Sequence, residues 1–565
     1  MSFSHSSSFS FRDDNTFNHI HGHQVNGPVT AGIVNFNNQV MVERTEYDEF
    51  EYVKRGHIVS MKEIYSELSQ WDWKWQNGGL TAQHKARKTI YTVELYPDRQ
   101  SKYTAVLYEG KDAHKAWKKD FKQFSCTRKP GIAQLFGINQ SAIPMLIFHH
   151  ELIPCAHFFK RTIWMNMYIH HLRANMKCGQ SQLWMNTANG ALFIGPNGPS
   201  APSPLSGADK PIDVPTGVEM LKDDTSFRFF SKFGSSLDGS VLFCAQQTYE
   251  IIHLENLFPE TAEDCQSKDS DHPDRGSATY PYLRGLWKNP PHHLPMDVIG
   301  GLRFDTVYSP SMKAIARWLQ GAGSLWWWWG YNRKGLVDET ELDVGTRFKL
   351  DLTRGQEVRL EANYYGWKLR EAWLSQSPRV FDAVDVTEQH ENFFIVNSPH
   401  LKIQSTQRPT ASSTSRNCKH SMKETPLTPT PIYLFLRPLP MSVSELVSWM
   451  EGQPYFWSLD ETGQSPMSEE ECARWGIPVL TLSTQGYVWL LSWPVHIYTA
   501  IRDWQNARGF DPATSAWAQS KHYPEFEILG DSGRSKDVVD AREEKQTSTS
   551  WWEAFEGSGI SAFGF

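Results

Sequence analysis

The sequence has few cysteines, no long apolar run and no excess of positive charge. Its seven cysteines are scattered singly over 565 residues, with no CxxC pair and an odd total, so we expect free thiols in an intracellular protein, cytoplasmic or nuclear. No run of about 18 apolar residues occurs, which argues against a membrane partner. Lys and Arg number 56 against 63 Asp and Glu, and this balance offers no broad cationic face to nucleic acid.

The sequence also lacks a segment typical of a secretory signal. Residues 1–14 are rich in Ser and contain neither an apolar core nor an early basic cluster. By contrast, 40% of all residues are hydrophobic and 13% are aromatic, which is enough apolar surface to offset the entropy of ordering the chain. Because domains usually hold about 100 to 200 residues, the length predicts several globular units.

The fold class expected from these patterns is α+β, with several domains. We expect an N-terminal module with an antiparallel sheet and a helix, followed by a larger mixed α+β region. The expected segments are a disordered Ser- and Asn-rich tail at 1–45, the module at 46–160, the mixed region at 161–404, a linker or loop rich in Ser, Thr and Pro at 405–431, a C-terminal α+β segment packed on the mixed region at 432–530, and a flexible tail at 531–565.

Periodicity within the N-terminal module predicts a helix, a hairpin, a second helix and two short strands. From "YVKRGHIVSMKEIYSELS" the pattern turns helical, since Ile58, Met61, Ile64, Tyr65 and Leu68 recur at helical spacing, with Ser60 and Glu63 as a capping box. "KTIYTVELYP" and "KYTAVLYEG" alternate around "PDRQS", which indicates an antiparallel hairpin. "DAHKAWKKDFKQFS" predicts a helix that buries Trp117 and Phe121, and short apolar runs bounded by Pro and Gly follow it.

This order of elements, together with its residues, resembles the small lobe of protein kinases. The segment "PGIAQLFGI" is similar to the stretch after the kinase regulatory helix, and "LIFHHELIP" is similar to the strand that leads into the hinge. The resemblance covers residues 56–160. It implies a kinase-like antiparallel sheet with one helix packed against it.

The residues that handle phosphate in kinases are missing from this module. The turn "YPDRQSKY" has no glycine to admit a nucleotide, and Leu107 or Tyr108 stands where the kinase lysine is expected. The helix offers Asp120 as its acid among four lysines, a pattern typical of a solvated face. No His-Arg-Asp loop or Asp-Phe-Gly segment follows, and the nearest string, "IRDWQN", has Arg508 in place of the loop asparagine. We therefore predict a degenerate module with no catalytic residue, no cofactor and no phosphotransfer.

Two other short motifs fall short of a catalytic or metal site. "HHELIP" approaches the zinc motif H-E-x-x-H at His150 and Glu151, but Pro154 replaces the second histidine and would break the helix that presents both ligands. "GSSLDGS" approaches a nucleophile elbow but has Asp238 where the tight turn needs glycine. The sequence therefore assigns no metal ligand.

Four consecutive tryptophans, Trp326 to Trp329, are the most unusual feature of a chain that holds 23. Four adjacent indoles cannot all point to one side of a backbone, so we expect two to face the core and two to cover a surface. In a functional interpretation, the outward pair together with Arg333 and Lys334 contacts a partner protein, or a stacked ligand such as a sugar or base.

Longer blocks further along the chain resemble a family of uncharacterised proteins from mushroom-forming fungi. "FWSLDETGQSPMSEEECARWGIPVL" and "DWQNARGFDP" carry this resemblance, together with the Asn-rich N-terminal tail and the degenerate kinase small-lobe module. The resemblance spans most of the chain but implies no activity.

These patterns favour a non-catalytic protein-interaction or scaffolding protein with an unidentified protein partner. One alternative is an enzyme whose active site lies within residues 217–530 and follows no recognised motif. Another is a carbohydrate- or ligand-binding module that uses surface tryptophans. The Ser-Pro and Thr-Pro pairs at Ser377, Thr425 and Thr428 are candidate phosphorylation sites.

Overall fold

The chain divides into two α+β units. The computed structural model describes residues 45–68, 73–76, 79–82, 86–98, 100–126, 131–200, 212–257, 280–291, 294–319, 321, 323–330, 333–343, 345–351, 357–405 and 430–529. Unit 1 comprises Met1–Cys155 and Ser181–Ser200, and unit 2 comprises Ala156–Gln180 and Ala201–Phe565. The expected tail at 531–565 lies outside the described residues, as do almost all of the expected tail at 1–45 and of the expected linker at 405–431, with Thr425 and Thr428.

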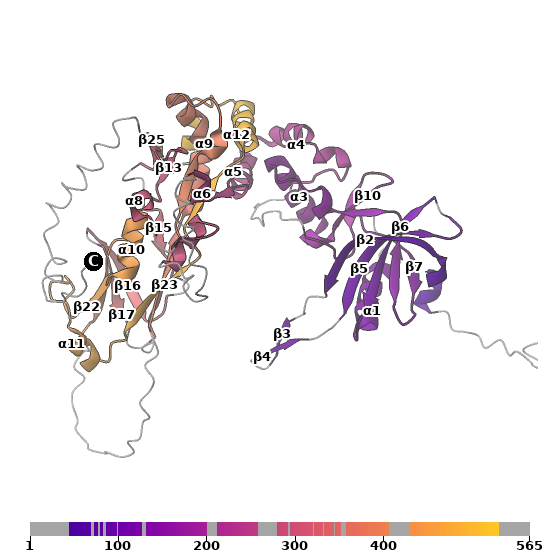
Figure 1. Ribbon diagram of the computed structural model, residues 1–565, viewed down its shortest axis with the longest axis horizontal. Coiled ribbons are helices and arrows are strands. Elements are labelled where there is room, and N and C mark those ends of the chain that lie inside the picture. Colours follow the sequence, from indigo (N-terminus) through magenta and orange to yellow (C-terminus); the bar gives the residue numbers. More distant parts are fainter. Residues whose placement is uncertain are drawn as a thin grey trace, which may run out of the picture. The chain divides into compact units, whose positions relative to one another are not determined.

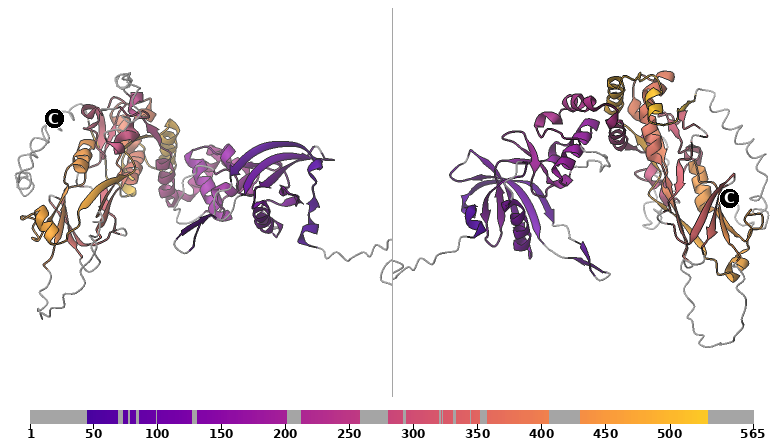
Figure 2. Two further views of the ribbon diagram at one scale, coloured as in Figure 1. Left: turned by 60° about the horizontal axis from the view of Figure 1, so that its bottom comes forward. Right: turned by 180° about the vertical axis from the view of Figure 1, so that it is seen from behind.

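Unit 1 is built on a six-stranded sheet. Its strand order is β1-β7-β8-β6-β5-β2, and each neighbouring pair is antiparallel except β1 with β7. The strands are β1 (Glu51–Tyr52), β2 (Ile58–Leu68), β5 (Arg87–Leu95), β6 (Lys102–Glu109), β7 (Leu135–Asn139) and β8 (Met145–Phe148). Helix α1 (Ala113–Ser125) packs against β6 and β8, and the views from different sides show it beside the sheet (Figures 1 and 2).

Two smaller strand groups complete unit 1. The hairpin of β3 (Trp73–Gln76) and β4 (Gly79–Ala82) lies between β2 and β5 in sequence. A three-stranded sheet joins β9 (Leu152–Pro154), β10 (Leu183–Asn186) and β11 (Leu192–Ile194). The expected module ended at residue 160, so the sequence did not indicate that 181–200 return to this unit.

The core of unit 1 confirms the predicted hairpin, helix and two strands. The β5–β6 hairpin pairs Ile90 with Val106, and α1 buries Trp117 and Phe121 against the same face of the sheet. These two aromatic rings stack at a centroid distance of 5.2 Å. Spacings of three and four residues bring apolar side chains to one side of a helix, and this side covers the sheet.

The helix predicted over "GHIVSMKEIYSELS" is wrong, because this segment forms β2, the long edge strand next to β5. Its pairing register shifts between Ile58 and Ser60 and again between Glu63 and Tyr65. Each bulge inserts one residue into the two-residue alternation of a strand, which produces spacings of three. Two bulges thus imitate helical periodicity, and Ser60 and Glu63 form no capping box.

Unit 2 combines a group of packed helices with a second six-stranded sheet. Helices α3 (Ile163–Met176), α5 (Asp238–Gln247), α9 (Gly366–Ala383) and α12 (Val495–Ala507) contact one another, and α4 (Asp223–Phe230) and α13 (Ala516–Ser520) join them. The sheet has the order β12 (Glu250–Ile252), β24 (Trp489–Ser492), β19 (Phe394–Asn397), β13 (Thr306–Tyr308), β14 (Ala314–Arg317) and β25 (Glu527–Ile528).

Two four-stranded sheets form the remainder of unit 2. One has the order β15 (Trp326–Trp328), β18 (Arg359–Tyr364), β20 (His400–Ser405) and β23 (Leu480–Gln485). The other has the order β16 (Leu336–Leu342), β17 (Gly345–Leu350), β21 (Tyr433–Leu436) and β22 (Tyr455–Ser458). Short helices α6 (Leu254–Leu257), α8 (Met296–Ile299), α10 (Val443–Glu451) and α11 (Glu469–Arg474) lie between strands in the sequence. Helix α2 (Cys155–Phe158) precedes α3 and begins at the last residue of the first segment of unit 1.

The two four-stranded sheets meet through the inward side chains of β15. The Trp328 ring lies edge-on to Phe348 of β17 at a centroid distance of 5.6 Å. The Trp328 indole N–H also donates to the hydroxyl of Thr346, at 3.2 Å. The first sheet therefore has an inner face toward its partner sheet and an outer face, on which the candidate site lies.

Short sequence signals account for both ends of α11, and burial bears on one candidate phosphorylation site. Ser468 and Glu471 form the capping box of α11, and Gly476 follows this helix with a positive φ of 66°. The candidate phosphorylation site Ser377 is fully buried within α9, and its hydroxyl donates to the carbonyl of Leu374, at 3.2 Å. Among the helices of the described residues, none is both long and apolar enough to cross a membrane.

Candidate functional site

The tryptophan run forms an edge strand in which the side chains alternate. In β15, Trp326 pairs with Tyr364 of β18 and Trp328 pairs with Ala362. Trp326 and Trp328 are buried, with 5% and 8% of their surface exposed, whereas Trp327 and Trp329 are half-buried. The prediction of two inward and two outward indoles is therefore confirmed, and strand geometry explains it because successive side chains point to opposite faces.

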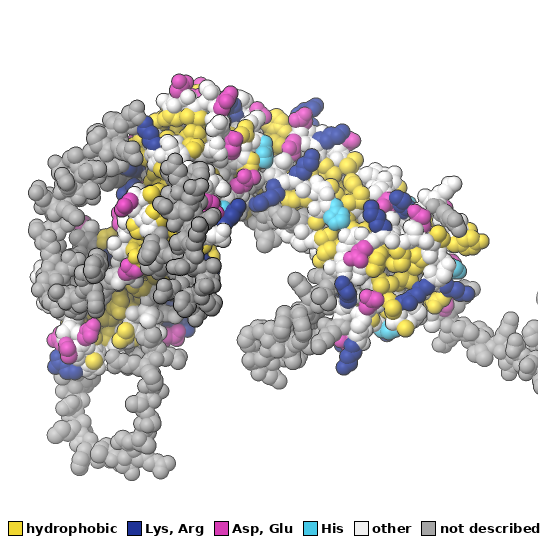
Figure 3. All heavy atoms as spheres, viewed as in Figure 1, with side chains coloured by type: hydrophobic (Ala, Val, Ile, Leu, Met, Phe, Trp, Pro, Cys, Tyr) yellow, Lys and Arg dark blue, Asp and Glu magenta, His cyan; other side chains and the backbone are white. Residues whose placement is uncertain are grey.

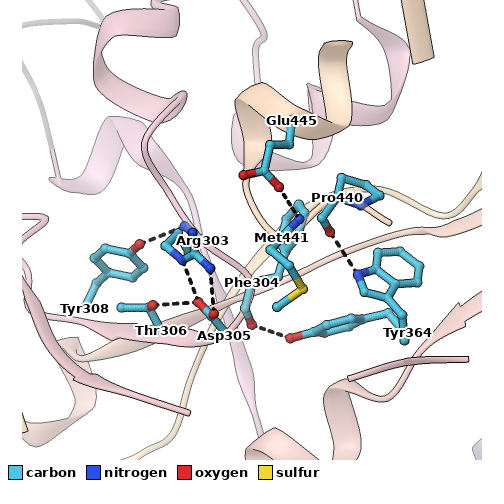
Figure 4. Close-up of polar contacts among 10 residues, drawn as sticks. Arg303, Phe304, Asp305, Thr306, Tyr308, Tyr364, Pro440, Met441 and Glu445 are labelled. Atoms are coloured by element: carbon cyan, nitrogen blue, oxygen red, sulfur yellow. Dashed lines mark hydrogen bonds and ion pairs between the residues drawn. The ribbon is translucent and has the colours of Figure 1, made fainter. Parts of the chain in front are cut away.

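Hydrogen bonds hold the inward side of the site in place (Figure 4). The Trp326 indole N–H donates to the carbonyl of Pro440 at 2.8 Å, and the Tyr364 hydroxyl donates to the carbonyl of Phe304. Burial raises the pKa of Tyr364 well above its ordinary value, so the phenol stays protonated as a donor. Two segments distant in sequence, around residues 304 and 440, are thereby fixed beneath the tryptophan run.

The same close-up shows a partly buried ion pair beside this base. The guanidinium of Arg303 donates two hydrogen bonds to the Asp305 carboxylate, at 3.0 and 2.9 Å, and the Thr306 hydroxyl donates a third at 2.8 Å. Hydrogen bonding to Asp305 raises the pKa of Arg303, while burial opposes it. The Tyr308 hydroxyl accepts from the Arg303 backbone N–H. Each of these polar groups has a protein partner, so we assign the cluster a supporting role.

Outward from this base, four aromatic side chains form a continuous row. We call Trp329, Trp327, Tyr365 and Trp367 the aromatic row. Trp327 and Tyr365 stack at a centroid distance of 5.1 Å with 14° between planes, and Trp329 lies 6.4 Å from Trp327. Trp367 lies edge-on to Tyr365 at 5.8 Å and is 40% exposed. The Lys368 ammonium lies 4.4 Å from the Tyr365 ring centroid, a cation–π distance.

Backbone contacts position the Tyr365 to Trp367 segment beside β15. The Tyr365 N–H donates to the carbonyl of Leu325 at 2.6 Å, which joins this segment to the residue just before the tryptophan run. Gly366 begins α9, and a Cβ there would lie 2.5 Å from the Asn397 side-chain oxygen. Because it has no Cβ, Gly366 permits the segment from Tyr365 to Trp367 to lie close to the Asn397 side chain.

The outer face of the sheet next to the aromatic row is polar. On this face β18 presents Asn363, Glu361 and Arg359, β20 presents His400, Lys402 and Gln404, and β23 presents Gln485, Ser483 and Thr481. The register aligns them in rows, since Trp327 pairs with Asn363 and His400 pairs with Gln485. All of these side chains except Glu361 are exposed or half-buried.

The charges on this face largely cancel. Glu361 is 6% exposed and accepts hydrogen bonds from Arg359, from Nε at 3.1 Å and from Nη2 at 2.6 Å. Partial burial lowers the pKa of His400, although the Glu361 carboxylate opposes this effect. The Tyr364 backbone N–H donates to His400 Nδ1 at 3.3 Å, which favours the neutral ring with its proton on Nε2.

Arg333 and Lys334, predicted to join the outward tryptophans, are engaged in ion pairs. Arg333 pairs with Glu339 and lies over the Phe348 ring, 5.0 Å from its centroid. Lys334 pairs with Glu357 at 3.2 Å. Of the predicted contact residues, the structure thus brings only Trp327 and Trp329 into the aromatic row. Tyr365, Trp367 and Lys368 were not predicted as contact residues, although the dense aromatic string "NYYGWK" was a signal.

In unit 1, the position expected for a kinase lysine is apolar or aromatic. Leu107 is half-buried and Tyr108 is fully buried in the core. The Tyr108 hydroxyl donates to Asp120 of α1 at 2.8 Å, and Lys88 of β5 pairs with the same carboxylate oxygen at 2.7 Å. Burial, followed by the Asp120 charge, raises the pKa of Tyr108 well above its ordinary value.

This arrangement corrects one prediction about α1. The four lysines of the helix are exposed, as a solvated face requires, but Asp120 is 8% exposed and points toward the sheet. The acid therefore belongs to the core-facing side. Its partner Lys88 comes from the strand next to β6, and sequence analysis of β6 alone did not reveal it.

The rejected motifs also have structural explanations. His150 lies in a turn after β8 with a φ of 69°, so no helix presents it together with Glu151. Asp238 begins α5 and accepts a hydrogen bond from Arg508 Nε at 3.2 Å. No cluster of three or more His, Cys, Asp or Glu side chains within the described part of the chain is arranged to hold a metal ion.

The fold and site together define an α+β protein of two units with an aromatic row on a polar sheet face. No protein-family model matches the chain, and neither does any curated protein. The function is therefore argued from the site itself.

Proposed function

We propose that this chain is a non-catalytic binding protein whose ligand or partner contacts the aromatic row of unit 2. The observation that carries the proposal is the stacked, partly exposed arrangement of Trp327, Tyr365 and Trp367, drawn from two segments of the chain. Unit 1 serves as a scaffold with the architecture of a degenerate kinase small lobe.

The aromatic row suits binding because its side chains are already ordered. Trp and Tyr rings have few rotatable bonds, and stacking against a neighbour removes part of the entropy that a ligand would otherwise have to restrain. Aromatic side chains also dominate the binding energy of known interfaces. The buried side chains of Trp326 and Tyr364 are hydrogen-bonded, and this fixes the backbone that carries the aromatic row.

The contacts of the Asp120 carboxylate in unit 1 favour a structural role over phosphotransfer. In a kinase, a lysine and an acid cooperate to hold the nucleotide phosphates. Here the Asp120 carboxylate is occupied by Tyr108 and Lys88, and Leu107 offers no charge. The alternative of an enzyme with its site within residues 217–530 stays a prediction, since no described cluster favours a particular reaction.

Two measurements on the purified full chain test the proposal. With Mg²⁺ and radiolabelled ATP, we expect no phosphotransfer to itself or to casein, and no rise in Tm with ATP. Arrays of glycans, peptides and single-stranded oligonucleotides should give binding to one class that falls when Trp327 and Trp367 are changed to Ala. Trp475→Ala is the matched control, because Trp475 is 49% exposed after α11 and lies outside the aromatic row.

Two results would overturn the proposal. One is robust phosphotransfer that is lost in Lys88→Met while the fold is kept. The other is the absence of binding to all three classes of ligand.

A further inference from the structure

The aromatic row borders a sheet face whose polar groups indicate the class of ligand. We infer that the outer face of the β15-β18-β20-β23 sheet binds a carbohydrate, with a sugar ring against the aromatic row and its hydroxyls on Asn363, His400 and Gln485. This inference rests on the proposed function, because it requires the row to be a binding surface.

A pyranose ring and an aromatic side chain are chemically complementary. One face of such a ring carries C–H bonds, which are weakly positive, and the face of an indole or phenol ring is weakly negative. The ring edges of the sugar carry hydroxyls that need hydrogen-bond partners. A site for a sugar therefore combines aromatic side chains with polar groups at their margin.

Polar side chains continue from the aromatic row across the sheet. Trp327 pairs directly with Asn363 of β18. The β18–β20 register pairs Ala362 with Leu401, and the Tyr364 N–H donates to His400 Nδ1, so His400 lies beside Asn363 at this end of the two strands. His400 in turn pairs with Gln485 of β23. Because neighbouring strands lie about 4.8 Å apart, these side chains extend from the tryptophan across the sheet in steps that short oligosaccharides span.

These polar side chains can form hydrogen bonds with sugar hydroxyls. An amide both donates and accepts hydrogen bonds, as a sugar hydroxyl does. Within the described residues, the side chains of Asn363 and Gln485 have no hydrogen-bond partner in the protein. His400 accepts at Nδ1 from the Tyr364 N–H, so its neutral ring offers an Nε2–H donor.

The charges on the face disfavour nucleic acid. Arg359 is neutralised by Glu361, which leaves Lys402 as the unpaired cation of the strands and Lys368 beside the aromatic row. Nucleic acid binding relies on many cations that neutralise phosphates. On the face of the molecule drawn in Figure 3, the described Lys and Arg side chains are interspersed with Asp and Glu.

A protein partner is also less well matched than a glycan. The buried centre of a protein interface is depleted in charge and rich in apolar contacts. Here the aromatic row lies at one edge of the sheet, while amide, imidazole, hydroxyl and charged groups occupy the centre of the face. A polyhydroxylated ligand satisfies such groups, whereas an apolar surface would leave them unpaired.

The test uses the full chain and four defined probes, the hexaoses of β-1,4-linked N-acetylglucosamine, β-1,4-linked glucose, β-1,3-linked glucose and mannose. We expect calorimetry to show binding of at least one hexaose. Trp327→Ala should weaken that binding about tenfold or more, and Asn363→Ala about threefold or more. Trp475→Ala is expected to bind as the unchanged protein does. A single cooperative unfolding transition within a few degrees of that of the unchanged protein shows that each variant keeps its fold.

The outcomes separate this inference from the proposed function. If no hexaose binds but peptides or oligonucleotides bind in a manner that needs Trp327 and Trp367, the carbohydrate inference is wrong and the binding function stands. If no ligand of any class binds, both are wrong. Hexaose binding that is unchanged in Trp327→Ala also overturns the inference, because the sugar then occupies another site.

Discussion

The rings of Trp327 and Tyr365 stack at 5.1 Å although each follows a residue whose side chain points into the core. The cause is the pairing of β15 with β18, which sets Trp326 against Tyr364 on the buried face. The next residue on each segment then points outward. One strand pairing therefore creates both a packed interior and an aromatic surface.

This alternation leads us to expect very different costs for two adjacent substitutions. Trp328→Ala removes a buried ring that contacts Phe348 and donates to Thr346, and should lower the free energy of unfolding by about 3 to 5 kcal/mol. Trp327→Ala removes a half-buried stacked ring and should cost about 1 kcal/mol. Urea denaturation followed by circular dichroism measures both, and equal costs would show that the alternation is wrong.

We expect Lys88 to contribute to stability through Asp120. Lys88→Met leaves the buried Asp120 carboxylate with the Tyr108 hydroxyl as its hydrogen-bond donor and without a cation. It should cost about 1 to 3 kcal/mol, reduced from the value for a deeply buried pair because Lys88 is partly exposed. Lys118→Met, on the exposed side of α1, is the control and should change stability by less than about 0.5 kcal/mol. Hydrogen exchange of α1 locates the effect in unit 1, and similar protection in both variants would contradict it.

The ion pair between Asp238 and Arg508 should stabilise unit 2. The Asp238 carboxylate is buried and also accepts from the Trp504 indole N–H at 2.8 Å, so it joins α5 to α12. Arg508→Ala leaves this charge without its cation and should cost about 3 kcal/mol. Arg502→Ala on the exposed side of α12 is the matched control in thermal denaturation. A loss of stability no larger than in the control would show that the ion pair does not stabilise unit 2.

Burial of His171 should make stability depend on pH. Its ring is fully buried, Nδ1 accepts from the Ile212 N–H at 3.3 Å, and burial lowers its pKa from 6.5 to about 4. The unfolded chain then binds a proton between these two values that the folded chain does not, so stability falls as pH decreases from 6.5 toward 4. The loss amounts to about 3 kcal/mol at most.

The variant His171→Gln keeps an acceptor but removes the titrating group. Other histidines with lowered pKa contribute in the same direction, so the comparison is between slopes of the two proteins. We expect the unfolding free energy of the variant to vary less steeply with pH over this range. The difference in slope should correspond to about one proton fewer taken up on unfolding. Identical slopes for the two proteins would count against a buried neutral His171.

Phosphorylation of Ser377 should not occur on the folded chain. The side chain is fully buried in α9, and a kinase needs an extended, accessible segment. Mass spectrometry after treatment with a proline-directed kinase should find Ser377 unmodified in the native protein and modified only after unfolding. Stoichiometric phosphate on Ser377 in the native protein, with Tm unchanged, would refute its burial.

The sequence predicts those elements whose stabilising pattern is local. The capping box of α11 and the apolar side of α12, with Ile497 and Trp504 buried, follow from spacing and capping that each segment carries by itself. The β5–β6 hairpin follows from alternation around a turn for the same reason. Even the two-by-two division of the tryptophan run is a property of any extended backbone.

Tertiary structure decided what depends on contacts between distant segments. The bulges of β2 arise from its pairing with β5, so periodicity alone misassigned a strand as a helix. Lys88 reaches Asp120 only because β5 lies next to β6. The aromatic row likewise needs β15 beside β18, a pairing that single-segment periodicity does not specify. The sequence by itself determined that two indoles point outward, and the fold determined which aromatic rings and polar groups lie beside them.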